Sequence, residues 1–152
     1  MSAPPKGTMR TARELALNLL FQVDVAKLSF DEALETAQEN ARIPREALDI
    51  GSELARGALE FAADSDRIVV ELAPEWPTDR QPSVDRNILR LALFELQHKP
   101  GTPFPVVMDE AVELAKLYST EDSGRFVNGV LAGFQRQREE AVVGGDRESG
   151  NP

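Results

Sequence analysis

Apolar residues recur every three to four positions through most of the chain, which is the spacing of one face of an α-helix. The only strand-like stretch, "RIVVEL" at residues 67–72, is too short to build a sheet by itself. The pattern predicts helices over residues 11–27, 31–40, 44–61 with a broken continuation to 72, 83–97, 106–119 and 122–138. We therefore expect an all-α fold with about six to seven helices.

Two helix starts are marked by local sequence. Thr11-x-x-Glu14 and Ser29-x-x-Glu32 both have the capping-box pattern, in which a hydroxyl side chain accepts from the backbone three residues on. In the helix after Thr11, apolar residues lie on nearly every face. That helix is therefore expected to lie at the centre of the fold.

The segment "APEWPTDRQP" at residues 73–82 holds three prolines and is the clearest break in the chain. We interpret it as the joint between an N-terminal half, about 10–75, and a C-terminal half, about 82–138, of a single domain. Residues 1–9 are expected to form a flexible arm. Residues 139–152 end in "VVGGDRESGNP", a Gly-rich polar composition typical of a disordered tail.

Charge is distributed unevenly over the 152 residues, whose formal net charge is −9. Residues 1–30 carry four basic side chains against two acidic ones, whereas residues 31–75 carry twelve acidic against four basic. A net negative charge argues against broad nucleic-acid binding, because phosphate contacts need Lys and Arg. The small basic end, with Lys6, Arg10 and Arg13, is the exception.

The sequence indicates a cytoplasmic protein. It has no cysteine, which excludes disulfides and thiolate metal sites and fits a reducing compartment. No window approaches 18 uncharged apolar residues, and the N-terminus lacks the apolar core of a secretory signal. No membrane association is therefore expected.

Candidate catalytic chemistry is sparse. His98 is the only histidine and lies at a predicted helix end, where a cationic side chain favours the helix dipole. Neither a Gly-rich phosphate loop nor an HExxH or GxSxG motif is present. Asp109, Glu110 and Glu113 share one helix, where adjacent acids point in different directions. We predict no enzyme activity, no catalytic residues, no metal site and no cofactor.

Binding is better supported by the first helix. Arg10 and Arg13 lie three residues apart, and Phe21 follows eight residues after Arg13 on a similar azimuth. Arginines that reach phosphates beside an aromatic ring that stacks on a base are the parts of a single-strand RNA site. The alternative is that Phe21 is simply a core residue.

Three stretches, "RTARELALNLLFQVD" (10–24), "ILRLALFEL" (88–96) and "DEAVELAKLYSTEDSGRFVNGVL" (109–131), resemble the NusB family of transcription antitermination factors. The resemblance is collinear from about residue 10 to residue 134. It implies two small helical bundles packed together. It also implies binding of box A RNA, most effectively as a heterodimer with NusE, a small-subunit ribosomal protein. Such a heterodimer joins the RNA polymerase antitermination complex and supports ribosomal RNA operon transcription and ribosome biogenesis.

Carried over residue by residue, the resemblance places an acidic NusE-contacting position at Asp85. With the basic end, the RNA-binding set is Lys6, Arg10, Arg13, Phe21, Asp122, Arg125 and Phe126. Structural alternatives remain for three of these positions: a helix-dipole acid at Asp122, a core residue at Phe126 and a helix cap at Asp85.

Two other functions stay open at this stage. One is a NusB-like adaptor that binds a protein partner with little RNA binding of its own. The other is the NusB-like domain that precedes some ribosomal RNA cytosine methyltransferases, although 152 residues leave no room for the catalytic domain. Some members of the family form homodimers that cover the arginine-rich surface, and the residues do not decide whether this chain does.

Within "RFVNGVL", Gly129 interrupts a predicted helix, where glycine costs about 1 kcal/mol relative to alanine. We expect its missing side chain to let a neighbouring helix approach closely.

Overall fold

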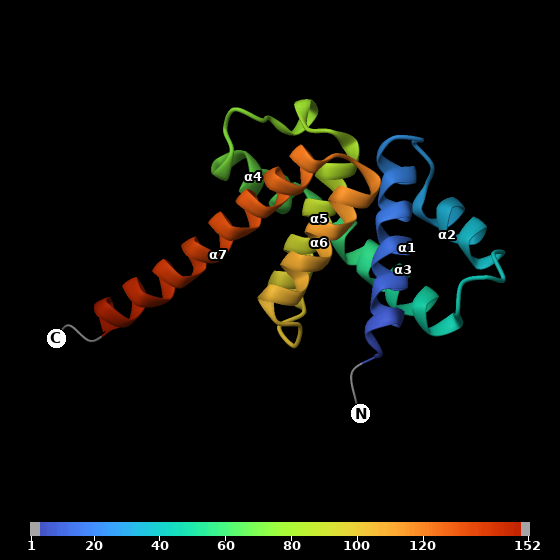
Figure 1. Ribbon diagram of the computed structural model, residues 1–152, viewed down its shortest axis with the longest axis horizontal. Coiled ribbons are helices and arrows are strands. Elements are labelled where there is room, and N and C mark those ends of the chain that lie inside the picture. The colour runs from blue at the N-terminus through green and yellow to red at the C-terminus, as the bar shows by residue number, and fades with distance from the viewer. Residues whose placement is uncertain (1–3, 150–152) are drawn as a thin grey trace.

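Seven α-helices and one 3₁₀ turn build the part of the chain that the computed structural model describes, residues 4–149, with side chains described as far as Val143 (Figure 1). The α-helices are α1 (Lys6–Asp24), α2 (Phe30–Gln38), α3 (Arg45–Glu60), α4 (Ala62–Leu72), α5 (Ser83–His98), α6 (Phe104–Tyr118) and α7 (Glu121–Ser149), and the 3₁₀ turn η1 (Thr78–Arg80) precedes α5. No strand occurs within this range. The predicted all-α fold is confirmed.

Two hydrophobic cores organise these helices. The first lies among α1, α2 and α3 and also takes in Leu91 and Phe94 from α5. The second lies among α4, α5, α6 and α7 and takes in Leu17 from α1. Helices α1 and α5 contribute buried residues to both cores, so they join the two bundles.

The boundary between the bundles differs from the predicted one. Helix α4 precedes the proline-rich segment, yet its Val69 is buried in the second core together with α5, α6 and α7. The chain passes from one bundle to the other at Phe61, between α3 and α4. The prolines at residues 73–82 therefore shape a loop within the second bundle. They break the helix locally but do not separate the two cores.

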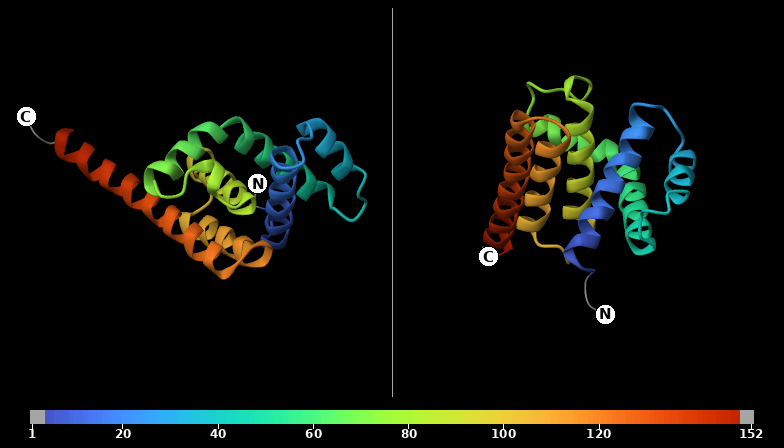
Figure 2. Two further views of the ribbon diagram at one scale, coloured as in Figure 1. Left: turned by 90° about the horizontal axis from the view of Figure 1, so that it is seen from above. Right: turned by 45° about the vertical axis from the view of Figure 1, so that its right-hand side comes forward.

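The predicted chain ends also differ from the structure. Helix α1 already begins at Lys6, and Thr11 donates its hydroxyl back to the carbonyl of Gly7 instead of capping the helix. Helix α7 continues to Ser149 and projects beyond the two cores (Figure 2). Extending a helix that is already anchored costs little, because its nucleus exists. Residues 6–9 and 139–149 are thus helical, while 1–3 and 150–152 lie outside the described residues.

The second capping prediction is confirmed. The Ser29 side chain accepts a hydrogen bond of 3.1 Å from the backbone N–H of Glu32 and fixes the start of α2.

Close helix packing occurs at glycines other than the expected one. Gly129 has no atom within 4 Å of the position that a Cβ would take, so the predicted close approach there is wrong. At Gly51 on α3 a Cβ would meet the carbonyl oxygen of Ala12 at 2.6 Å, and at Gly57 it would meet the ring of Phe94 at 2.0 Å. These two glycines let α3 pack directly against α1 and α5.

An ion pair joins α1 to α5 inside the protein. The Arg13 guanidinium donates from Nη2 to Oε1 of Glu95 at 3.0 Å and from Nε to Oε2 at 3.0 Å. The two side chains are only 5% and 3% exposed. A buried charge is tolerated only when it is paired and hydrogen-bonded, so each residue requires the other.

A second charged network ties the end of α1 to α4 and α5. Arg86 donates to Asp24 at 2.6 Å, and Arg90 donates to Asp66 at 2.7 Å. Burial raises the pKa of the Asp24 carboxyl, but hydrogen bonds from Arg86 and Asn87 outweigh this and hold the pKa below its usual value. A lowered carboxyl pKa stabilises the fold above the pKa of the unfolded state, and this stabilisation is lost as the pH falls.

Replacement of Arg13 by alanine is expected to lower the free energy of unfolding by about 3–5 kcal/mol, because it leaves the Glu95 carboxylate buried without a partner. Urea unfolding measures this change. The control is Arg67→Ala, which breaks an exposed pair with Asp64 on α4 and should cost no more than about 1 kcal/mol. Equal losses in the two variants would contradict the role given to the buried pair.

A pair of glycine substitutions tests the helix packing. Gly51→Ala should destabilise the protein by about 1–3 kcal/mol, since the added methyl group would press on the backbone of α1. Gly129→Ala should instead stabilise it by about 0.5–1 kcal/mol, because alanine favours the helix and meets open space. Thermal unfolding measures whether each variant is more or less stable than the unchanged protein. A more stable Gly51→Ala variant would contradict the close packing of α3 against α1.

Candidate nucleic-acid interface

The arginines of α1 occupy two different environments. Arg10 lies on the outer side of the helix with its side chain 50% exposed, and Lys6 is also exposed. Arg13 points inward and forms the buried pair with Glu95. This burial contradicts the prediction that Arg13 contacts RNA. Sequence spacing alone could not separate the two, because the partner of Arg13 lies 82 residues away.

Arg10 is held by a carboxylate on the neighbouring helix α6. Its Nε and Nη2 atoms donate to the two carboxylate oxygens of Glu110 at 3.3 and 3.2 Å. These hydrogen bonds, together with the charge of Glu110, raise the pKa of Arg10, and the charges of Glu113 and Glu14 add to the effect. The exposed guanidinium therefore already has an anionic partner within the protein.

Phe21 lies at the edge of a surface cleft. Its side chain is partly exposed, so the alternative that it is a core residue is wrong. The cleft has a volume of about 230 Å³ and is lined by Glu14, Leu17, Asn18, Phe21, Val84 and Tyr118. Residues from α1, α5 and α6 thus place two aromatic side chains around one small hollow with an apolar floor.

Tyr118 was missed by the sequence reasoning. It is the only tyrosine of the chain and stands at the last position of α6, with 49% of its surface exposed. Partial burial raises the pKa of its hydroxyl, and the neighbouring Glu14 raises it further. The signal in the sequence was a single tyrosine directly before the polar run "STEDS" at residues 119–123.

The start of α7 presents the remaining predicted residues. Asp122 and Arg125 are highly exposed and pair with each other at 2.8 Å. Phe126 is half-buried and packs edge-to-face against Trp76, with ring centroids 6.3 Å apart. The hydroxyl of Thr120 caps the helix by accepting from the backbone of Ser123 at 3.0 Å. Asp122 therefore remains at the surface, while Phe126 belongs partly to the second core.

Asp85 does not reach the surface. It is 2% exposed, and its Oδ1 atom has no hydrogen-bond partner among the described residues. Burial raises the pKa of this carboxyl, and the hydroxyls of Ser123 and Ser119 partly offset the rise. The prediction that Asp85 contacts a protein partner directly is thus contradicted. It lies instead near the hydroxyls of Ser119 and Ser123, on either side of the α6–α7 turn.

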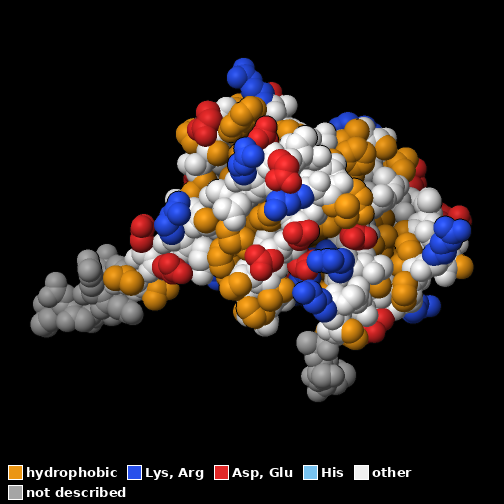
Figure 3. All heavy atoms as spheres, in the orientation of Figure 1, with side chains coloured by type: hydrophobic (Ala, Val, Ile, Leu, Met, Phe, Trp, Pro, Cys, Tyr) orange, Lys and Arg blue, Asp and Glu red, His pale blue; other side chains and the backbone are white. Residues whose placement is uncertain are grey.

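Charges of both signs cover the face formed by α1, α6 and α7. In Figure 3, Lys and Arg side chains alternate with Asp and Glu, and no broad basic field is visible on this face. Among the described residues, no three His, Asp or Glu side chains converge in a way that could hold a metal ion. No helix within residues 4–149 is long and apolar enough to cross a membrane.

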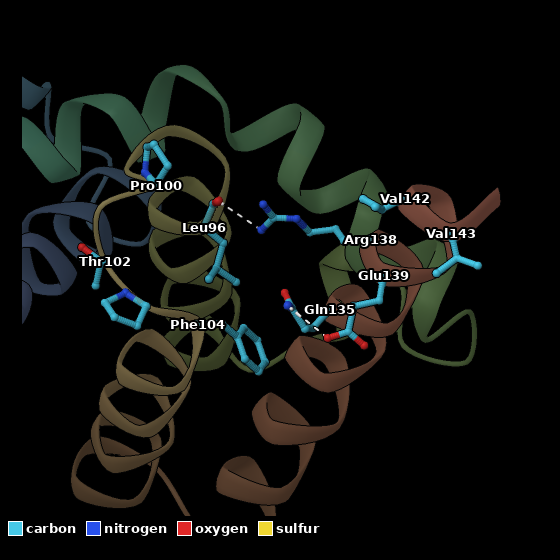
Figure 4. A pocket seen from close by; sticks show the side chains of 10 residues that line it. Leu96, Pro100, Thr102, Phe104, Gln135, Arg138, Glu139, Val142 and Val143 are labelled. Atoms are coloured by element: carbon cyan, nitrogen blue, oxygen red, sulfur yellow. Dashed lines mark hydrogen bonds between the residues drawn. The ribbon is translucent and has the colours of Figure 1, made fainter. Parts of the chain in front are cut away.

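A larger cleft lies away from all the predicted site residues. It has a volume of about 520 Å³ and runs between the α5–α6 turn and the projecting part of α7. Figure 4 shows Arg138 donating across it to the carbonyl of Leu96, with Val142 and Val143 further along α7. Its lining is mostly apolar and includes none of the residues expected to bind RNA.

The two hydrophobic cores and the helices around them define an all-α domain of two packed bundles. The sequence profile of the NusB family matches residues 10–136. The chain is 41% identical over 134 residues to the transcription antitermination protein NusB of Desulforamulus reducens, covering 88% of this chain and 93% of the relative. The NusB of Symbiobacterium thermophilum is 43% identical over 135 residues, covering 84% and 88%. The chain therefore belongs to the NusB family.

Solved structures agree with this assignment. NusB of T. maritima has a TM-score of 0.75 and 33% sequence identity, with 87% of this chain and 90% of that chain covered. A NusB chain solved with NusE and double-stranded RNA has a TM-score of 0.75 and 26% identity, with 88% and 99% covered. The expected NusB-like fold is confirmed.

The burial of Asp85 predicts that the Asp85→Asn variant is more stable than the unchanged protein, by an amount that depends on pH. Because burial raises the folded-state pKa, the protein loses stability as the pH rises from the unfolded-state carboxyl pKa to the raised folded-state pKa, and the full cost applies above it. The neutral amide avoids this cost, so the variant should be the more stable protein at neutral pH. The advantage should vanish in acid, near the ordinary carboxyl pKa of about 3.9. Urea unfolding at the two pH values tests this, and a pH-independent difference would contradict it.

Proposed function

We propose that this chain is an RNA-binding transcription antitermination factor of the cytoplasm. It binds box A RNA most effectively as a heterodimer with NusE and acts with RNA polymerase in ribosomal RNA operons, and so in ribosome biogenesis. The observation that carries the proposal is the placement of Phe21 and Tyr118 around one surface cleft of a NusB-family fold. The proposal includes no catalytic step and no cofactor.

Different residues of the proposed surface are suited to different parts of the RNA. Lys6 and Arg10 supply cations for phosphates at one end of α1. Phe21 and Tyr118 offer ring faces on which unpaired bases can stack, a contact worth about 1–3 kcal/mol per base. At the start of α7, the paired Asp122 and Arg125 and the half-buried Phe126, which packs against Trp76, complete the proposed surface.

Affinity for RNA alone is expected to be low. Arg13 is buried, and both Arg10 and Arg125 are paired with carboxylates, so few cations are free to meet phosphates. A basic ribosomal protein would complement the net charge of −9 and contribute its own cations. The support for the partner is that a NusB of similar fold has been solved together with NusE and double-stranded RNA.

The same pairing of cations favours a second candidate function. A NusB-family adaptor that binds a protein partner, with little RNA binding of its own, needs no free arginines on α1. The two functions differ in whether Arg10 contributes to RNA affinity.

Titration of labelled box A RNA at two salt concentrations, with and without NusE, tests the proposal. We expect NusE to increase the affinity and added salt to decrease it. Arg10→Ala should weaken binding, because it removes a cation that can contact a phosphate. Arg13→Ala is unsuitable here, because it removes a buried ion pair.

Arg67→Ala is the matched control, since it deletes an exposed arginine on α4, a helix that contributes no residue to the proposed surface. Its RNA affinity should equal that of the unchanged protein. If Arg10→Ala binds RNA normally while NusE still binds, the adaptor function is the correct one. If NusE brings no gain in RNA affinity, the heterodimer proposal fails.

A further inference from the structure

The exposed arginine of the RNA surface is engaged before any RNA arrives. Both carboxylate oxygens of Glu110 accept hydrogen bonds from Arg10, at 3.2 and 3.3 Å. The Glu110 side chain is only 9% exposed, whereas that of Arg10 is 50% exposed. The acid is therefore fixed against the body of the protein, while the guanidinium keeps one side open to solvent.

A phosphate and a carboxylate compete for the same face of a guanidinium. Two oxygens of either group can accept parallel N–H hydrogen bonds from arginine. A phosphate that takes the Nε and Nη2 donors of Arg10 must displace Glu110 from them. Two further acids, Glu113 and Glu14, contribute negative potential at the same guanidinium.

We propose that Glu110 is an affinity-setting residue of the RNA surface, which competes with RNA phosphate for Arg10. This inference rests on the proposed RNA-binding function and specifies how the affinity of that surface is limited. In the free protein Glu110 neutralises Arg10. When RNA binds, the phosphate replaces the carboxylate, and Glu110 is left in a partly buried position without its partner. The exchange lowers the net gain from the Arg10–phosphate contact.

The exchange has a signature in the salt dependence. A free arginine that meets a phosphate releases a counterion from the RNA, which steepens the dependence of affinity on salt. When Arg10 leaves Glu110 to bind a phosphate, the free carboxylate attracts a cation from solution. The number of ions released in the whole exchange is therefore close to zero. Loss of the Glu110 charge should therefore raise the affinity and steepen the salt slope together.

The test is Glu110→Gln, which keeps the size of the side chain and one acceptor oxygen but removes the charge. We expect this variant to bind box A RNA roughly three- to tenfold more tightly than the unchanged protein, as loss of a competing ion pair implies. The salt slope should steepen by about 0.7. Binding is measured by titration of labelled RNA, with NusE present and absent, after thermal unfolding has shown that the variant folds.

Two controls separate competition at Arg10 from a general loss of negative charge. Glu113→Gln removes an equal charge from α6, but Glu113 makes no hydrogen bond to Arg10 among the described residues. Its affinity should change less than about twofold, the range of an unpaired surface charge. In the Arg10→Ala background, Glu110→Gln should give no gain. An equal gain in that background, or in Glu113→Gln, would overturn the inference.

A second measurement needs no RNA. Phenylglyoxal modifies accessible arginines, and mass spectrometry locates the modified residue. Arg10 should react faster in Glu110→Gln than in the unchanged protein, because its guanidinium is no longer held. Equal rates would overturn the inference even if the protein binds RNA. If no variant binds RNA with or without NusE, the proposed function fails, whereas RNA binding without any gain in Glu110→Gln overturns this inference alone.

Discussion

Arg13 on α1 and Glu95 on α5 face each other in the interior, joined by two hydrogen bonds of 3.0 Å and at most 5% exposed. Neither charge is tolerable there without the other. The pair fixes the rotation of α1 about its own axis, because Arg13 must face α5. Once that rotation is set, Arg10 faces α6 and Phe21 faces the cleft beside Tyr118. The proposed binding surface thus depends on an ion pair that is buried beneath it.

Helix α1 belongs to both cores, and this shared position explains how the surface is assembled. Leu19 and Leu20 pack with α2 and α3, while Leu17 packs with α5, α6 and α7. The remaining side of the helix carries the residues proposed to bind RNA. The residues of this surface are exposed, but the helix that carries them is held in position by packing in both cores. The competition proposed between Glu110 and phosphate depends on the same geometry, because α6 places Glu110 within hydrogen-bond distance of Arg10.

Local features of the fold were predictable where short-range physics decides them. Ser29 caps α2 as expected, because the bond spans only three residues. The exposure of Asp122 and Arg125 also agreed with expectation, since both lie in the first turns of a helix whose apolar stripe falls on other residues. Arg13, Asp85 and Gly129 were misjudged. The environment of each depends on which distant helix packs nearby, and spacing along one helix does not contain that information.

The sequence by itself determined the helical class, the family and the types of residue available for binding, because periodicity and motifs are properties of the chain order. Only the tertiary structure decided which arginine is buried, which glycine touches a neighbouring helix and where the two bundles meet. Those outcomes rest on contacts such as Arg13 with Glu95, which are 82 residues apart. Burial and charge pairing are set by what lies across a packed interface, so they emerge only when the helices have assembled.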